Sequence, residues 1–162
     1  MSSLFMLSKR SLLFLATLVV LAFSVSSFAE RTQQEQDNID LVVEFYNVAL
    51  NDLNAEKALT YLGDTYIQHN PVAQNGPEGL AGFINYLKGQ FPQNHNDIKK
   101  AYADGDHVFL HVHSKRTPDS RGNAIIDIFR VDDGKIVEHW DVIQEIPAES
   151  ANDNTMFYGN DG

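Results

Sequence analysis

Carboxylates and imidazoles recur in the last three apolar runs of the chain, and these residue types suit acid–base chemistry. Asp127 lies in the second run, while His139 and Asp141 stand close together in the third. A carboxyl group in an enclosed apolar site can take a proton from beside a carbonyl and later protonate an alkoxide. An imidazole paired with a carboxylate is held in one tautomer. Asp141, Asp127 and His139 are therefore the predicted catalytic residues; the alternative roles are an ion pair or turn cap for Asp141 and a structural polar pair for the others.

The three runs alternate apolar and polar residues with period two, which predicts β-strands. They cover residues 107–113, 124–131 and 135–143, and Asp133-Gly134 between the last two is typical of a tight hairpin. Side chains alternate faces along a strand. One face of this sheet is therefore predicted to present ionisable and aromatic side chains together: Phe109, His111, His113, Asp127, Phe129, His139 and Asp141.

Further side chains are predicted to complete a substrate site. His69 and Asn70 precede Pro71 where a short strand meets a loop, and they could hydrogen-bond a carbonyl that becomes an enolate. The same Asn-Pro pair is also common at the start of a turn. Tyr46, from a helix, is expected in the pocket wall. The predicted substrate-binding residues are His69, Asn70, His111, His113, Phe109, Phe129 and Tyr46.

The histidines also allow a metal site. His111 and His113 on one strand face, joined by His69 and completed by Asp127 or Asp141, offer ligands suited to zinc or iron. Their spacing matches no known metal signature. We therefore predict neither a metal nor a cofactor, and a metal-binding variant that uses this histidine cluster remains an alternative.

The N-terminal segment has the pattern of a secretory signal peptide. Lys9 and Arg10 precede the apolar run 12–25, and Ser27-Phe28-Ala29 supplies small residues at a cleavage site. Residues 1–29 are predicted to be this signal, with a retained membrane anchor as the alternative, so the protein is expected to be periplasmic or secreted. Residues 30–147 are predicted to form one domain, and the polar residues 148–162 a flexible tail.

Composition narrows the possible partners. The formal net charge is −10, and loss of Lys9 and Arg10 would make it more negative. Such a charge disfavours nucleic acid and anionic membrane surfaces as partners. The chain has no cysteine, so its stability must come from packing without disulfides.

The order of elements predicts an α+β fold with helices on one side of a curved antiparallel sheet. Apolar residues at helical spacing and end signals predict helices, and weaker alternation predicts two more short strands. The expected helices are 34–50, 55–62 and 76–91, and the additional strands 64–69 and 98–102.

Residues 66–79, 105–113 and 127–144 together resemble the SnoaL-like branch of the NTF2-like superfamily. The resemblance implies a cone: a curved antiparallel sheet of about four to six strands wrapped on three N-terminal helices. It also implies a pocket between sheet and helices, and often a homodimer through the outer face of the sheet. Trp140, which lies on the opposite face from Asp141 by alternation, would suit such an interface or the core.

Characterised SnoaL-type proteins are polyketide cyclases that carry out an intramolecular aldol condensation without cofactor or metal. The resemblance places their catalytic aspartate at Asp141, and offers His111 or His113 and Asn70 as its companions. The resulting hypothesis is a small exported acid–base enzyme of aldol cyclase, isomerase or dehydratase type that acts on a small hydrophobic carbonyl compound. A periplasmic ligand-binding module without turnover and a structural dimer are the alternatives.

Overall fold

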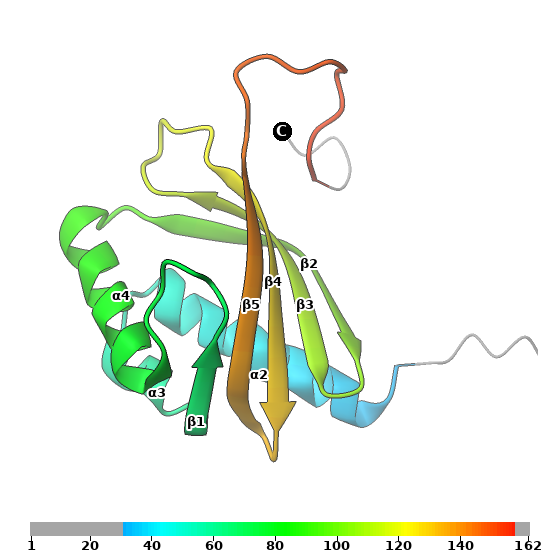
Figure 1. Ribbon diagram of the computed structural model, residues 1–162. Helices are drawn as coiled ribbons and strands as arrows, with labels where there is room; N and C mark the ends of the chain where they lie inside the picture. Colours follow the sequence, from blue (N-terminus) through cyan, green and yellow to red (C-terminus); the bar gives the residue numbers. More distant parts are fainter. Residues whose placement is uncertain (1–30, 158–162) are drawn as a thin grey trace, which may run out of the picture. The chain divides into compact units, whose positions relative to one another are not determined.

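The computed structural model describes residues 31–157 of the chain, so the predicted signal peptide at 1–29 and the last residues of the predicted tail lie outside the described part. The elements follow in the order α2 (Gln33–Leu50), α3 (Ala55–Leu59), β1 (Leu62–Gln68), α4 (Gly76–Gln90), β2 (His95–Asp104), β3 (His107–Lys115), β4 (Asn123–Asp132) and β5 (Lys135–Glu145) (Figure 1). None of the helices in this part is both long and apolar enough to cross a membrane.

Local signals set the helix ends. Thr32 and Glu35 form a capping box at the start of α2, in which each side chain accepts from the other's backbone N–H. Pro77 occupies the first turn of α4, where its missing N–H costs nothing. The short helix α3 ends at Leu59, before the predicted end at Leu62, because Leu62 already pairs with β5 as the first residue of β1.

The strands form one five-stranded sheet in the order β1-β5-β4-β3-β2, and α2 lies across one face of it (Figure 1). Neighbouring strands are antiparallel except β1, which runs parallel to β5 at the edge. The predicted α+β fold is thus confirmed. The face toward α2, here called the inner face, carries most of the buried strand side chains of the core: Val108, Leu110, Val112, Ile125 and Phe129. The opposite face is called the outer face.

A β-bulge interrupts the β4–β5 hairpin just after its turn. Val131 pairs with Ile136, but Arg130 pairs with Glu138, so Val137 is one extra residue in β5. Val137 and Ile136 are both buried, which shows that alternation fails at this point.

The bulge decides which side chains of β5 face the helices. Beyond it, Asp127 pairs directly with Asp141, and directly paired residues share a face of the sheet. A regular hairpin through the same turn would have paired Asp127 with Trp140 instead. The extra residue therefore brings the ionisable side of β5 onto the inner face.

Candidate active site

A cavity of about 180 Å³ lies between α2, α4 and the inner face of the sheet. Its wall is mainly apolar, with Phe45 from α2, Leu80 and Phe83 from α4, and Ile125 and Phe129 from β4. The polar side chains that reach it include Asn70, Arg116, Asp127, His139 and Asp141. A largely apolar cavity with a few convergent polar groups is typical of a small-molecule site.

Asp127 and His139 form a buried hydrogen-bonded pair on neighbouring strands. His139 Nε2 lies 3.0 Å from Asp127 Oδ1, and both side chains are nearly inaccessible to solvent. The Tyr46 hydroxyl donates to the other oxygen, Asp127 Oδ2, at 2.9 Å. The carboxyl group of Asp127 is therefore held from β5 and from α2 at once.

Gln68 fixes the proton on the far side of the His139 ring. Gln68 Oε1 accepts from the backbone N–H of Asn70 at 2.9 Å and lies 3.0 Å from His139 Nδ1. Because that oxygen can only accept, Nδ1 carries a proton. The Nε2–Oδ1 contact then joins the other side of the ring to the carboxyl group of Asp127, so His139 is held from both of its ring nitrogens.

Asp141 is held differently, by a single neutral amide. Asn70 Nδ2 lies 2.8 Å from each carboxylate oxygen of Asp141. Asn70 Oδ1 accepts from the backbone N–H of Val72, which orients the amide so that its N–H groups point to Asp141. Asp141 is partly exposed to the cavity, so its carboxylate is available to a ligand there.

Two tyrosines supply neutral hydroxyl groups. Burial raises the pKa of Tyr46 well above its usual value, and the neighbouring charge of Asp127 raises it further. Burial likewise raises the pKa of Tyr66, with smaller contributions from Asp127 and Asp141. Tyr66 accepts from Gln68 Nε2 at 3.3 Å and keeps its own O–H as a donor. Both tyrosines therefore remain protonated donors around neutral pH.

The same acids could hold a cation. One ligand atom each from Asp127, His139 and Asp141 lies within 4.8 Å of the others, and two carboxylates with one imidazole are ligands for several divalent metals. This set differs from the predicted histidine cluster, which the fold does not assemble.

The prediction that β3 contributes Phe109, His111 and His113 to this face was wrong. Leu110 is the partner of Asp127, so Phe109 and His111, which pair with Ile128 and Ile126, lie on the outer face together with His113. Val108, Leu110 and Val112 are fully buried on the inner face. The aliphatic side of β3 packs against the core, since it loses less hydration free energy there than the imidazoles would.

His69 was expected to point inward and instead lies on the outer face. Its ring stacks on Trp140 with centroids 4.7 Å apart, and its Nε2 lies 2.8 Å from Glu138 Oε1. Hydrogen bonds from His69 and then Arg130 lower the pKa of Glu138. Trp140 lies on the outer face, as its alternation with Asp141 along the strand predicted.

Many side chains of the site had not been predicted, among them Tyr66, Gln68 and Arg116. Tyr66 and Gln68 precede Asn70 at a spacing of two residues, which could have placed all three on one side and His69 on the other. Arg116 continues the alternation of Ser114 just past the end of β3. The other predicted residues, Tyr46, Asn70 and Phe129, do line the cavity with Asp127, His139 and Asp141.

The family described as the SnoaL-like domain matches residues 42–139, more than half of the chain. The chain belongs to this SnoaL-like family. The match includes Asp127 and His139 and ends just before Asp141. None of the curated proteins matches the chain.

Solved structures share this SnoaL-like fold at low sequence identity. A protein assigned as a polyketide cyclase from Bacillus cereus is 23% identical, with 66% of this chain and 74% of that chain covered and a TM-score of 0.58. One assigned as a ketosteroid isomerase from Kribbella flavida is 14% identical, with 74% and 86% covered and a TM-score of 0.60. An LEH-like epoxide hydrolase from M. tuberculosis is 20% identical, with 68% and 84% covered and a TM-score of 0.54. These similarities establish the fold and leave the reaction to be argued from the site.

Proposed function

We propose that this SnoaL-like protein is an acid–base enzyme that acts on a small hydrophobic carbonyl compound, with Asp141 as the acid and base. One observation carries the proposal: Asp127 is held by His139 and Tyr46, whereas the carboxylate of Asp141 faces the apolar cavity and, within the described residues, has the Asn70 amide as its only hydrogen-bond partner. A carboxylate so placed suits proton transfer to and from carbon.

In the proposed reaction, Asp141 takes a proton from the carbon beside the substrate carbonyl. The electron pair of that C–H bond forms the C=C bond of an enolate, and the carbonyl oxygen becomes negative. The Tyr66 O–H, which has no acceptor in the described part of the chain, can donate to that oxygen.

Two outcomes restore the carboxylate. In an isomerase or dehydratase, Asp141 returns its proton to another carbon or to a leaving hydroxyl group. In an aldol cyclase, the enolate carbon attacks a second carbonyl of the same molecule, and Asp141 protonates the alkoxide that forms. No cofactor is needed in either sequence, because every proton removed is returned by the same group.

Proton abstraction is the step shared by these reactions, and it can be tested without the natural substrate. Exchange of the α-protons of 2-tetralone in D₂O, followed by ¹H NMR, should be faster with the protein than with buffer alone. The rate should not change when a chelator is added. A rate equal to that of buffer across a panel of small ketones would refute the proposal.

A non-catalytic ligand-binding module remains the second candidate, and the mainly apolar wall of the cavity favours it. It predicts that the same ketones shift the backbone amide resonances of cavity residues without any α-proton exchange. The exchange assay and the titration together separate the two functions.

We also propose that the protein is exported, on the basis of the N-terminal pattern at residues 1–29. Expression of the full chain in a bacterium should then give a periplasmic or secreted protein whose intact mass begins at Glu30. A mass that keeps residues 1–29 in a membrane fraction would favour the anchor instead.

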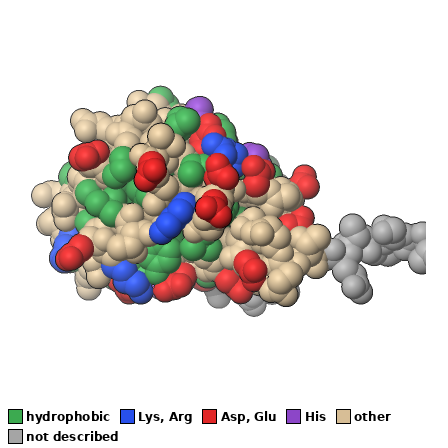
Figure 2. Space-filling view, turned by 90° about the horizontal axis from the view of Figure 1, so that it is seen from below, with side chains coloured by type: hydrophobic (Ala, Val, Ile, Leu, Met, Phe, Trp, Pro, Cys, Tyr) green, Lys and Arg blue, Asp and Glu red, His purple; other side chains and the backbone are tan. Residues whose placement is uncertain are grey.

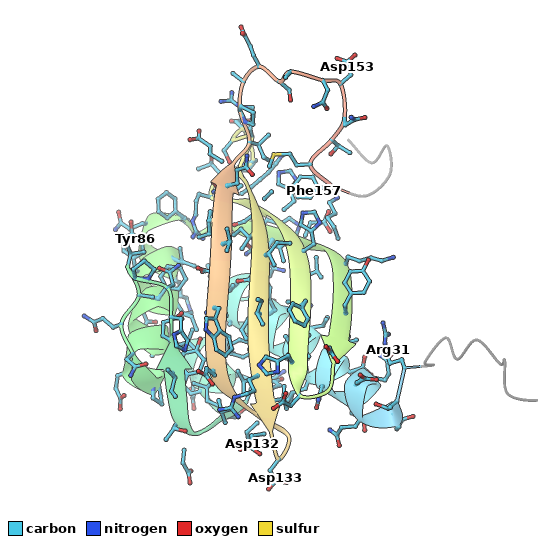
Figure 3. The ribbon with its side chains drawn as sticks, turned by 45° about the vertical axis from the view of Figure 1, so that its right-hand side comes forward. Arg31, Tyr86, Asp132, Asp133, Asp153 and Phe157 are labelled. Atoms are coloured by element: carbon cyan, nitrogen blue, oxygen red, sulfur yellow. The ribbon has the colours of Figure 1, made fainter. Side chains whose placement is uncertain are left out.

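The homodimer remains a prediction, and the outer face offers the surface for it. Tyr102, Ile126 and Val142 expose 43%, 41% and 71% of their surface, and Ile126 and Val142 are cross-strand partners. Phe157 of the tail turns back onto the His113 ring, with centroids 4.7 Å apart (Figure 3). By contrast, the side of the protein seen from below in Figure 2 has acidic side chains scattered between its apolar ones.

Val142→Glu should therefore convert a dimer to a monomer in sedimentation velocity, because it places a charge among the exposed apolar side chains of the outer face. Val72→Glu is the matched control, since Val72 is 92% exposed and lies away from the strands. Dimers that persist equally in both variants would exclude the outer face as the interface.

A further inference from the structure

Arg116 brings an unmatched positive charge to the cavity. It follows β3 in step with Ser114 on the inner face, and both residues line the cavity. Within residues 31–157, no ion pair includes Arg116. The other charged residues of the cavity, Asp127, His139 and Asp141, come from β4 and β5.

Neutral neighbours hold the Arg116 guanidinium in place. Its Nη1 donates to Asn94 Oδ1 at 2.6 Å, and its Cζ lies 5.7 Å from the centroid of the Phe83 ring. Asn94 is itself buried, and its Nδ2 donates to the backbone carbonyl of Leu50 at 2.6 Å. The guanidinium is thus positioned without being neutralised, and several of its N–H donors are left for a ligand.

Such an arrangement costs free energy in the empty protein. Arg116 is partly buried, and burial lowers its pKa, although a guanidinium stays charged at any usable pH. A desolvated charge without a counterion is destabilising. Charges of this kind that line a cavity are candidates for ligand binding.

We infer that Arg116 binds a carboxylate of the substrate, so that the substrate is a small hydrophobic keto acid. This inference rests on the proposed function for the identity of the reacting carbonyl. A planar guanidinium can grip a carboxylate through two parallel hydrogen bonds. A phosphate dianion would be expected to meet more than one cation, and the described lining contains only Arg116 and the paired His139.

The charges of the cavity also orient this substrate. A carboxylate is repelled by Asp141 and attracted by Arg116, whereas Asp127 already has His139 and Tyr46 as partners. The charge of Arg116 is also felt at the Tyr46 hydroxyl. Burial is the largest effect on the pKa of Tyr46 and raises it, whereas Arg116 lowers it. The anionic end therefore lies at Arg116, and the uncharged carbonyl end reaches Asp141 and Tyr66.

The test compares two probes of nearly the same shape, the anion 3-phenylpropanoate and the neutral 3-phenylpropanamide. Binding is measured by titration of ¹⁵N-labelled protein, for the native protein and for Arg116→Gln, Arg116→Lys and Arg130→Gln. Arg130 is the matched control, because it pairs with Glu138 through a 2.9 Å contact. Thermal unfolding of each variant checks that the fold is retained.

The native protein should bind the carboxylate at least about tenfold more tightly than the amide, as expected for a charge-assisted bidentate contact. Arg116→Gln should remove this preference, Arg116→Lys should keep part of it, and Arg130→Gln should leave it unchanged. Equal binding of both probes, a preference that survives in Arg116→Gln, or binding of neither probe would overturn the inference. None of these results bears on α-proton exchange by Asp141, which is measured with an uncharged ketone.

Discussion

Asp141→Asn is expected to slow α-proton exchange of 2-tetralone by a factor of about 10² to 10⁴, the usual contribution of a positioned general base. An amide has nearly the shape of a carboxylate, but it cannot accept a proton from carbon. Asn70 would still have an amide oxygen to donate to at this position. The loss should therefore fall on the rate, with little change in stability or in ketone binding.

The control for this variant is Asp133→Asn at the tip of the β4–β5 hairpin (Figure 3). Asp133 is exposed and has a φ of 47°, a conformation that asparagine also tolerates. The Asp133→Asn substitution removes the same charge at the hairpin tip, away from the cavity. The exchange rate of this variant should therefore equal that of the native protein. Native exchange in Asp141→Asn would show that Asp141 is not the base.

Most of the fold could be predicted because its signals are local. The period of two in β3, β4 and β5, the capping residues of α2 and Pro77 of α4 each specify their own segment. Such signals do not depend on what a segment packs against. They therefore place the elements correctly without showing which face of each strand meets the core.

The shared face of Asp127 and Asp141 was predicted from alternation, and it holds because of a feature that alternation cannot reveal. The tight turn at Asp133-Gly134 alone would have placed Asp141 on the outer face. The extra residue in the bulge at Val137 places Asp141 on the inner face instead. Val137 also packs against the neighbouring strand, where a Cβ on Gly63 would come within 2.8 Å of Val137 Cγ1, a contact that the hairpin sequence does not show.

The faces of β3 could not be predicted in the same way. The loop at residues 116–122 is too long to fix a register by turn geometry, and a shift of one residue exchanges the two faces. Phe109 and His111 were chosen for the pocket because of their chemistry, whereas packing selected Leu110. Arg116 belongs to the same inner face. Its position in the cavity could not be predicted either, because the sequence does not show which face of β3 meets the core.

Gly122, at the end of this loop, lies against β3, and Gly122→Ala should lower the free energy of unfolding by about 2–5 kcal/mol. Its φ is +80°, which costs an L-residue about 1–2 kcal/mol. An added Cβ would also lie 2.2 Å from the backbone oxygen of Ser114, which cannot move without disturbing β3, and overpacking of this kind costs about 1–3 kcal/mol. Urea unfolding followed by circular dichroism measures the change.

Gly105→Ala is the matched substitution in the β2–β3 turn. Its φ is also positive, at 59°, but nothing lies within 4 Å of an added Cβ, so only the conformational cost of about 1–2 kcal/mol should remain. A larger loss in Gly122→Ala would locate the difference in the contact with Ser114, and equal losses would exclude that contact. Because Ser114 lines the cavity, the displacement of β3 in Gly122→Ala should also weaken binding of ketones there, while Gly105→Ala should not.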